Sequence, residues 1–282
     1  MTLNIGGKLL DCTTPMVMGI LNVTTDSFYS ASRIQNQDAI RQRAAQILSE
    51  GGEIIDVGAF STRPGASVVA EDEEMRRLDQ AIAIIRQTYP EVLISVDTFR
   101  ASVARRCVSE YGVNIINDVS GGALDEKMFE MVADLRVPYV LTHSGGMADD
   151  KTDQSGTPVE DMCRFFAERL QKLHELGVAD VILDPGFGFG KTLQQNYEVM
   201  HRLSDIIGLF PDHPFLVGIS RKPMIYRLLD TSPEEALNGT TVLNTLALQA
   251  GAHILRVHDV REAVEIVRIM AQVNNSQSSI VN

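Results

Sequence analysis

Polar side chains follow most of the short apolar segments of this sequence, at the point where each segment ends. The set comprises Asn22 with Thr24 and Asp26, Asp97, Asn117 with Asp118, His143, Asp184, Ser220 with Arg221 and Lys222, and Arg256 with His258 and Asp259. Carboxylates and amides such as Asp97, Asn117 and Asp184 suit a flat heterocycle with several N–H donors, because a carboxylate accepts two parallel hydrogen bonds from an amidine-like edge. One part of the set therefore indicates a pocket for such a ring.

A second part of the set favours an anion. Arg256, His258 and Asn22 offer hydrogen-bond donors, and donors fixed where negative charge develops stabilise an anionic leaving group. The sequence therefore carries residues for two half-sites.

Some members of the set, taken alone, have a purely structural explanation. Asp97, Asp118 or Asp259 alone would more often be a helix N-cap than a ligand. Asp184 differs, because a Pro-Gly turn follows it and leaves no clear helix to cap. Its position favours a ligand role.

The apolar segments that carry these residues recur eight times. They are Met16–Leu21, Ile54–Gly58, Leu93–Val96, Ile115–Ile116 with Asn117, Tyr139–Leu141, Val181–Leu183, Phe215–Ile219 and Ile254–Val257. Nearly continuous Val, Ile and Leu is typical of parallel strands covered on both faces. Helical spacing of apolar residues follows the strands, as in Met75, Leu78, Ile82 and Ile85.

Eight strand–helix units predict an α/β fold, a (β/α)8 TIM barrel, rather than a doubly wound open sheet built from the same units. The C-terminal ends of barrel strands meet on one rim, so the polar residues should share one site. We expect one domain over 1–282, a short N-terminal hairpin over Leu3–Asp11 around a Gly-Gly turn, and a disordered polar tail over 274–282.

Composition limits the possible partners. A net charge of -12 argues against a nucleic-acid or anionic-membrane surface. No segment has the length of a membrane span, and Met1 to Pro15 lacks a signal-peptide pattern. Cys12, Cys107 and Cys163 are too few and scattered for a disulfide framework, and Cys107 and Cys163 are predicted to be core or near-core residues. A cytoplasmic location is expected.

Other chemistries fit less well. The stretch from Gly186 to Thr192 resembles a phosphate loop, but the nucleotide motif needs four residues between its glycines, whereas Gly186 and Gly190 enclose three, and no convincing helix follows. The six histidines show no zinc-ligand spacing, and no Ser-His-Asp arrangement is evident.

Seven motifs occur in order along the chain. They are Met18-Gly-Ile-Leu-Asn-Val-Thr with Asp26-Ser-Phe, Ile55-Asp-Val-Gly with Ser61-Thr-Arg-Pro-Gly, Ile94-Ser-Val-Asp-Thr, Ile115-Ile-Asn-Asp, Leu183-Asp-Pro-Gly-Phe-Gly-Phe-Gly-Lys, Ser220-Arg-Lys and Arg256-Val-His-Asp-Val. Together they resemble the dihydropteroate synthase family. The resemblance implies a transferase of folate biosynthesis that condenses (7,8-dihydropterin-6-yl)methyl diphosphate with 4-aminobenzoate, gives 7,8-dihydropteroate and pyrophosphate, and is a target of sulfonamides.

The resemblance also implies a role for each matched residue. The pterin is expected to bind to Asp97, Asn117, Asp184 and Lys222. The diphosphate is expected to bind to Asn22, Arg256 and His258, and a magnesium ion (Mg2+) to Asn22. The residues expected to bind 4-aminobenzoate are Phe28, Thr62, Arg63, Pro64 and Lys222. The residues implied in catalysis are Asn22, Arg63, Asp97, Lys222, Arg256 and His258. A dissociative, SN1-like reaction and a homodimer are implied as well.

The chain departs from the family pattern in four places. Thr25 replaces a usual proline, and Tyr29-Ser-Ala-Ser-Arg replaces a common Asp-Gly-Gly, which predicts altered ordering of the first loop. Thr142 replaces a usual methionine, which predicts a slightly more polar or roomier pterin pocket. Pro223 replaces a serine expected to meet the carboxylate of 4-aminobenzoate, and proline offers neither a hydroxyl nor an N–H.

Three other readings remain. A pterin-dependent methyltransferase barrel shares the fold and the ring contacts but has no use for a diphosphate pocket, so Arg256 and His258 favour the synthase. A non-catalytic pterin-binding protein would bind the pterin diphosphate without turnover. A synthase tolerant of antifolates would keep the chemistry and change only the discrimination between 4-aminobenzoate and sulfonamides.

Overall fold

The chain is represented by a computed structural model that describes residues 1–23, 33–60, 69–145 and 156–278, without the side chains of 33–36 and 275–278. Eight parallel strands form its main sheet in the order β8-β7-β6-β5-β4-β3-β10-β9. Their bounds are β3 Met16–Asn22, β4 Ile54–Gly58, β5 Leu93–Asp97, β6 Ile115–Asp118, β7 Tyr139–Thr142, β8 Val181–Asp184, β9 Leu216–Val217 and β10 Ile254–Val257.

The sheet closes into a nearly complete barrel. β9 pairs with β10 through Leu216 and Val217, and it meets β8 at the isolated bridge between Leu183 and Phe215. The predicted barrel is therefore confirmed. The seventh predicted strand is shorter than expected, because Gly218 and Ile219 leave the ladder and lead into the turn that carries Ser220 to Lys222.

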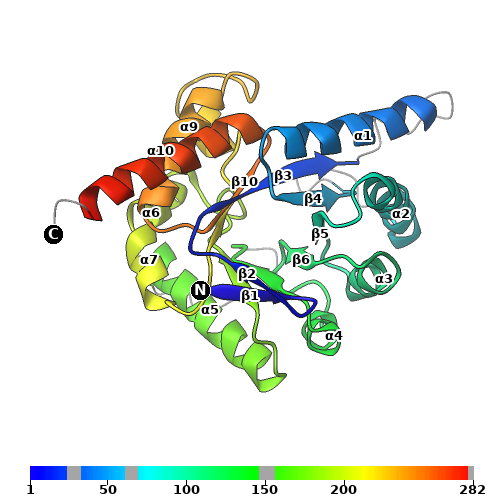
Figure 1. Cartoon of the computed structure of the whole chain (residues 1–282). Coiled ribbons are helices and arrows are strands. Elements are labelled where there is room, and N and C mark those ends of the chain that lie inside the picture. Colours follow the sequence, from blue (N-terminus) through cyan, green and yellow to red (C-terminus); the bar gives the residue numbers. More distant parts are fainter. Residues whose placement is uncertain (24–32, 61–68, 146–155, 279–282) are drawn as a thin grey trace.

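Helices surround the strands (Figure 1). They are α1 Arg33–Ser49, α2 Glu71–Thr88, α3 Ala101–Tyr111, α4 Met128–Leu135, α5 Pro158–Glu175, α6 Leu193–His201, α7 Leu203–Leu209, α8 Pro223–Tyr226, α9 Leu237–Gln249 and α10 Val260–Ser278. Local sequence explains where some of them begin. Thr157 caps α5 in a capping box with Glu160, which satisfies backbone N–H groups that have no partner inside the helix.

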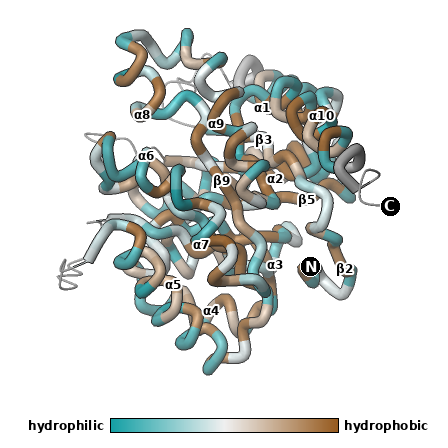
Figure 2. Tube along the Cα trace, turned by 90° about the vertical axis from the view of Figure 1, so that its left-hand side faces the viewer, coloured by the Kyte–Doolittle hydropathy of each residue, from teal (hydrophilic) through white to brown (hydrophobic). Residues whose placement is uncertain are grey.

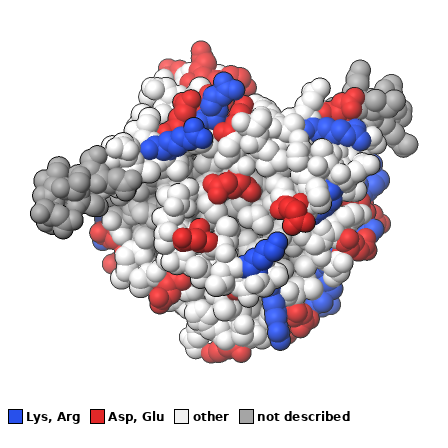
Figure 3. Space-filling view, viewed as in Figure 1, with Lys and Arg blue, Asp and Glu red and all other residues white. Residues whose placement is uncertain are grey.

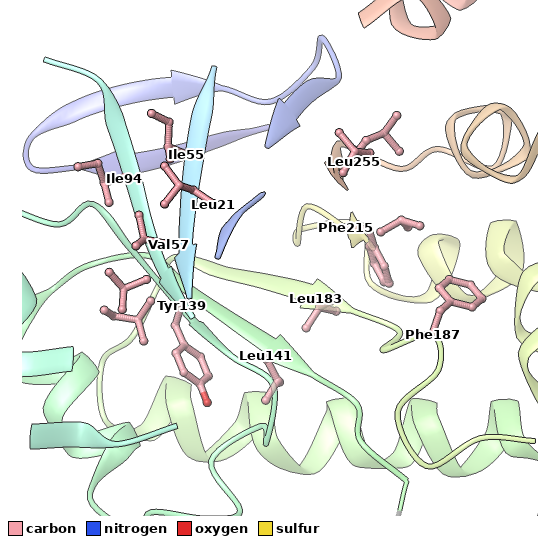
Figure 4. Packing of buried hydrophobic residues seen from close by; sticks show 14 of the residues in the cluster. Leu21, Ile55, Val57, Ile94, Tyr139, Leu141, Leu183, Phe187, Phe215 and Leu255 are labelled. Carbon is pink, nitrogen blue, oxygen red and sulfur yellow. The ribbon is translucent and has the colours of Figure 1, made fainter. Parts of the chain in front are cut away.

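The outer core lies between the strands and the helices. Alternate strand residues point outward into it, including Ile55, Val57 and Ile94, and Figure 4 shows these with Tyr139 and Phe215 in the same layer. All five are fully buried, and burial of a large apolar side chain contributes about 1.5–3 kcal/mol. Cys107 belongs to this core and Cys163 packs against it, which confirms their predicted placement.

A second apolar cluster fills the lower part of the barrel interior, at the N-terminal ends of the strands. Its buried members are Leu3, Cys12, Met16, Met18, Ile54, Ile115, Val140, Ile182, Leu216 and Ile254. Leu3 comes from the predicted N-terminal hairpin, which is confirmed as β1 (Thr2–Ile5) paired antiparallel with β2 (Lys8–Asp11). Gly6 and Gly7 both have positive φ, as a two-residue hairpin turn requires.

The hairpin covers the N-terminal end of the barrel. It lies in front of the strands in Figure 1, and Figure 2 shows it at the opposite end of the molecule from α8. The backbone N–H of Asn4 donates to Asp180 just before β8, at 2.8 Å. The hairpin therefore closes the end of the barrel that lies away from the polar strand ends.

The C-terminal helix runs further than the sequence indicated. α10 continues to Ser278, so residues 274–278 are helical, and 279–282 lie outside the described residues. None of the described helices has the length and apolar character needed to cross a membrane. On the face seen in Figure 3, basic side chains are interspersed with acidic ones.

Candidate active site

The upper part of the barrel interior is polar where the lower part is apolar. Alternation along the strands turns the residues above the lower cluster inward, towards the barrel axis. Strand pairing places Asp56 beside Ser95, Asp97 beside Asn117, and Thr142 beside Asp184. The register therefore gathers these side chains at the C-terminal ends of the strands.

Arg256 links two carboxylates at the centre of this polar layer. Its Nε donates to Asp56 Oδ2 at 2.7 Å and its Nη2 donates to Asp97 Oδ2 at 2.8 Å. Asn117 Nδ2 lies 3.3 Å from both oxygens of Asp56. Asp97 Oδ1 is buried and has no hydrogen-bond partner among the described residues. Buried polar atoms are normally paired, so this oxygen is an acceptor that fits a ligand N–H.

The carboxylates and Arg256 change one another's pKa. Burial raises the pKa of Asp97 to about 7, against the opposing effect of Arg256, and the nearby charge of Asp56 adds to the rise. Burial would lower the pKa of Arg256, but the carboxylates of Asp56 and Asp97 outweigh it and raise that pKa. Arg256 is therefore a permanent cation, whereas Asp97 can change its charge near neutral pH.

Lys222 and Asp184 lie on the other side of the site. Lys222 Nζ donates to the carbonyl of Phe187 at 2.6 Å and lies 4.3 Å from the ring centroid of Phe189, a cation–π geometry. Asp184 Oδ1 accepts the N–H of Gly186 at 2.7 Å. Burial lowers the pKa of Lys222 to about 8 and raises that of Asp184, while their opposite charges counter both shifts. The two groups offer opposite charges that suit a polar ring.

His258 follows β10 and is held by Ser220. Its backbone N–H donates to Ser220 Oγ at 3.1 Å, and its Nδ1 lies 3.1 Å from the same oxygen. Arg43 Nη2 donates to the His258 carbonyl at 2.6 Å. Burial, together with the charge of Arg256, lowers the pKa of His258 to about 4. At neutral pH this imidazole is therefore uncharged and acts through a hydrogen bond.

Asn22 ends β3 on the exposed side of the site. A Cβ atom built onto Gly58 would lie 3.2 Å from Asn22 Oδ1 and 3.8 Å from Asp97 Oδ2, so both oxygens face the small space beside this glycine. The described residues contain no group of three or more His, Cys, Asp or Glu side chains placed to hold a metal ion. Mg2+ often takes only one or two protein oxygens and completes its shell with water and substrate phosphates. Asn22 fits that kind of site.

Several other polar residues at the strand ends serve local structure. Asp118 accepts hydrogen bonds from Ser120, Gly122 and Tyr139, which shapes the turn after β6. Arg221 forms a two-bond pair with Asp259, at 2.9 and 2.8 Å. The contacts of Asp118 and Asp259 are thus local, but they are to a turn and to an arginine side chain rather than the helix N-cap bonds considered from the sequence.

The Gly-rich stretch after β8 is a structural turn around Lys191. Lys191 Nζ donates to the carbonyls of His143, Gly186 and Phe189, at 2.9, 3.0 and 3.4 Å. The sequence interpretation was wrong in one respect, because α6 begins directly after Thr192, which caps it. The side-chain amine of Lys191 is nonetheless hydrogen-bonded to backbone carbonyl oxygens.

Asp56 was missed as a site residue. It lies inside β4, whereas the other polar residues of the site lie at or after strand ends. A signal was present, because a single carboxylate in an otherwise apolar buried strand needs a partner to offset its desolvation. Its partner Arg256 lies 200 residues away along the chain.

The structure brings together Asn22, Asp97, Asn117, Asp184, Lys222, Arg256 and His258 at one end of the barrel. Some of the residues singled out lie outside the described part of the chain, among them Thr24, Thr25, Asp26, Phe28, Thr62, Arg63 and Pro64.

Comparisons with known proteins agree on one family. Residues 18–258 match the family model described as pterin binding enzyme. The chain is 40% identical over 274 residues to a dihydropteroate synthase from Escherichia coli K12, covering 94% of this chain and 93% of that protein. The structure resembles Yersinia pestis dihydropteroate synthase in a sulfonamide complex, with a TM-score of 0.85, 36% identity, and 98% and 100% of the two chains covered. It also resembles Xanthomonas albilineans dihydropteroate synthase with 4-aminobenzoic acid, with a TM-score of 0.84, 35% identity, and 97% and 98% covered.

Proposed function

Because this chain belongs to the dihydropteroate synthase family of pterin-binding enzymes, we propose that its barrel condenses (7,8-dihydropterin-6-yl)methyl diphosphate with 4-aminobenzoate. The products are 7,8-dihydropteroate and pyrophosphate, so the enzyme serves folate biosynthesis and belongs to the class that sulfonamides inhibit. The observation that carries this proposal is the buried layer around Arg256, in which Asp97 Oδ1 is left without a partner in the described structure.

The pterin ring is assigned to the inner part of the site. Asp97 Oδ1 and Asp184 are acceptors for the N–H groups of the ring, and Asn117 and Lys222 supply donors for its acceptor atoms. Asp97 uses its other oxygen for Arg256, so one carboxylate serves both half-sites.

The diphosphate is assigned to Asn22, Arg256 and His258. Arg256 provides a permanent positive charge, and His258 provides an uncharged donor at neutral pH because its pKa is about 4. A magnesium ion held by Asn22 and the diphosphate oxygens would supply Lewis-acid stabilisation of the leaving group. Asp56 holds Arg256 in the orientation that this task needs.

The reaction proceeds dissociatively in this proposal. The bond from the methylene carbon to the diphosphate breaks first, and the ring carries the resulting positive charge. The amine of 4-aminobenzoate then forms the new C–N bond and loses one proton, which the released pyrophosphate or water accepts. Asp97 and Asp184 face the electron-poor ring, and fixed charges of this kind are a large source of rate enhancement. The aromatic amine is uncharged at neutral pH, so no strong general base is needed.

The 4-aminobenzoate site is assigned to Phe28, Thr62, Arg63 and Pro64, with Lys222 at its boundary with the pterin. The first four lie outside the described residues, and the assignment rests on the matched family motifs. Arg63 is the natural partner for the carboxylate, because a guanidinium binds a carboxylate with two parallel hydrogen bonds.

Pyrophosphate release tests this function. The purified protein is given the pterin diphosphate and magnesium, with and without 4-aminobenzoate. Release should depend on 4-aminobenzoate and be lost in Asp184→Ala and in Arg256→Ala. A methyltransferase would release no pyrophosphate, and binding of the pterin diphosphate without turnover would identify a non-catalytic protein.

We also propose a homodimer, a cytoplasmic location and a single barrel domain over residues 1–282. Val242 and Leu246 on α9, with Ile269 and Val273 on α10, are 44–63% exposed, although they are large apolar residues. A second copy would cover such a surface. Three free cysteines suit a reducing compartment. Light scattering after gel filtration measures the mass, and a monomer that persists at micromolar concentration would contradict the dimer.

A further inference from the structure

Side-chain contacts replace the hydrogen bonds between strands where β9 and β10 separate. The two strands pair over only two residues of each. Beyond them, two consecutive contacts join the turn after β9 to the end of β10, because Ser220 binds His258 and Arg221 binds Asp259. The turn that supplies a pterin residue is thereby held against the segment that supplies a diphosphate residue.

Arg221 fixes the position of that turn. Its φ of 54° lies in the left-handed region, which a residue with a side chain rarely adopts unless its surroundings hold it there. Its backbone N–H donates to Thr240 Oγ1 at 3.0 Å, and its guanidinium binds both oxygens of Asp259, at 2.9 and 2.8 Å. The backbone beside Ser220 is therefore held by contacts that do not involve the ring of His258.

The backbone of His258 is held from two sides. Its N–H donates to Ser220 Oγ at 3.1 Å, and its carbonyl accepts Arg43 Nη2 at 2.6 Å. Arg43 Nε also donates to the carbonyl of Ile20 on β3, the strand that pairs with β10. Since both backbone groups of His258 are bound, the remaining freedom of this residue is the rotation of its ring and the position of its proton.

The Ser220 hydroxyl also lies 3.1 Å from the ring atom Nδ1 of His258. Ser220 is 4% exposed, and its hydroxyl has no partner other than His258 among the described residues. If Nδ1 carried the proton, the oxygen would accept two hydrogen bonds and its own hydrogen would be buried without an acceptor, which is costly. If Nδ1 is bare, the hydroxyl donates to it and every group is satisfied. The second arrangement places the imidazole proton on Nε2.

The ring atom Nε2 of His258 is the one left for a ligand. Within the residues that the structure describes, Ser220 is the only hydrogen-bond partner of this ring. A proton on Nε2 makes that atom a donor, and the oxygens of a diphosphate are acceptors. The other tautomer would present a bare nitrogen, whose lone pair repels those oxygens. The tautomer therefore decides whether His258 stabilises or opposes the anion.

We propose that Ser220 is a positioning residue that fixes the Nε2–H tautomer of His258 and so directs a hydrogen-bond donor at the leaving diphosphate. The inference rests on the proposed assignment of His258 to the diphosphate. Ser220 does not touch substrate in this proposal and acts through His258 alone. Its effect increases during the reaction, because negative charge develops on the diphosphate oxygens as the bond to the methylene carbon breaks.

The tautomer is measured directly and without substrate. In protein that contains ¹⁵N-labelled histidine, long-range ¹H–¹⁵N spectra distinguish a protonated ring nitrogen from a bare one, and His258→Ala identifies the signals of this residue. We expect a protonated Nε2 and a bare Nδ1 in the unchanged protein at neutral pH, and a mixture of both tautomers in Ser220→Ala. Ser220→Thr keeps the hydroxyl and should keep the single tautomer.

The functional readout is the difference between the two half-sites. In Ser220→Ala, kcat/KM for the pterin diphosphate should fall by about tenfold, and the Kd of magnesium pyrophosphate, measured by calorimetry, should rise by about three- to tenfold, as for one weakened hydrogen bond to a charged group. The Kd of a dihydropterin without the diphosphate should change by less than about threefold. Ser220→Cys, whose thiol is a weak donor, should show smaller changes in the same direction and serves as the second variant if Ser220→Ala does not fold.

Thr240→Val is the matched control, since it removes a hydroxyl that binds the same turn at the N–H of Arg221 and does not contact His258. It should leave the tautomer and the Kd of pyrophosphate unchanged. A protonated Nδ1 in the unchanged protein, a single Nε2–H tautomer in Ser220→Ala, or a mixture in Thr240→Val as well, would overturn the proposal.

His258→Ala separates the inference from the function on which it rests. An unchanged Kd of pyrophosphate in His258→Ala would overturn the assignment of His258 to the diphosphate itself. A raised Kd in that variant, with a normal tautomer and a normal Kd in Ser220→Ala, would overturn only the role of Ser220.

Discussion

The lower and upper halves of the barrel interior come from the same eight strands, yet the lower half is apolar and fully packed whereas the upper half is polar. The lower half is filled by side chains such as Met18, Ile54 and Ile182, all fully buried. The upper half buries Asp56, Asp97 and other polar groups, and leaves some of their atoms without partners in the described structure. Close packing stabilises the first half, whereas unpaired buried acceptors destabilise the second until a ligand arrives.

Two arginines show the difference in detail. Arg86, near the N-terminal end of the barrel, donates to four backbone carbonyls and to Asn114 Oδ1. Its partners are uncharged, and burial lowers its pKa. Arg256 at the other end donates to two carboxylates, which raise its pKa. Arg86 therefore completes its bonding within the chain, whereas the group around Arg256 keeps an oxygen of Asp97 for a ligand.

The largest expected effect comes from the upper half. Asp56→Asn removes the charge that orients Arg256 Nε while keeping the shape of the side chain. We expect kcat/KM to fall by about 10²–10³-fold, as when one preorganised electrostatic group is lost from an active site. Pyrophosphate release measures it. Activity close to that of the unchanged enzyme would mean that Arg256 does not need this partner.

The matching change, in the shell outside the N-terminal end of the barrel, should affect stability instead. Arg86→Met removes five hydrogen bonds from a half-buried guanidinium, and we expect the free energy of unfolding to fall by about 2–4 kcal/mol. Urea denaturation measures this loss. Activity of the folded variant should stay within about threefold.

Arg105→Met is the control for that change. Arg105 forms a surface pair with Asp134 and should contribute less than about 1 kcal/mol. An Arg86→Met variant that is stable but inactive would contradict the division between residues that stabilise the fold and residues that serve the site.

The positions of most upper-half residues could be predicted from the sequence, but the hydrogen bonds between them could not. Strands ending in Asn22, Asp97 or Asp184 were recognisable because apolar runs stop where polar residues begin. Asp56 escaped because it lies within a strand, and its contact with Arg256 depends on barrel closure. The length of β9 could not be predicted either, because Phe215–Ile219 is apolar throughout. Only the structure shows at which residue the hydrogen bonding between strands stops.

The pH dependence of pterin binding sharpens the comparison further. The pKa of Asp97 is raised to about 7, so protonation below that pH removes the acceptor that the ring needs. We expect the Kd of the pterin diphosphate to rise by about tenfold from pH 8 to pH 6. Calorimetry in matched buffers measures it, and Asp97→Asn should flatten the profile. A Kd that is constant over this range would contradict the role of Asp97.

The same titration acts on stability with the opposite sign. The folded state binds the Asp97 proton more tightly than the unfolded state, whose carboxyl has a pKa near 3.8. This group therefore destabilises the fold at pH above 7 and ceases to do so as the pH falls towards 4. Lower pH should strengthen the fold at this position while it weakens pterin binding.

The smallest expected effect concerns Pro223, at the edge of the upper half. It is the first residue of α8, directly after Lys222, and has no N–H to offer a carboxylate. Pro223→Ser adds an N–H and a hydroxyl, so we expect the KM for 4-aminobenzoate and the inhibition constant of a sulfonamide to fall by about three- to tenfold, the value of one hydrogen bond. Pro223→Ala restores only the N–H and separates the two donors. If the inhibition constant is unchanged in Pro223→Ser, this position does not set sulfonamide affinity, and the departures at Thr25 and in residues 29–33 become the places to test.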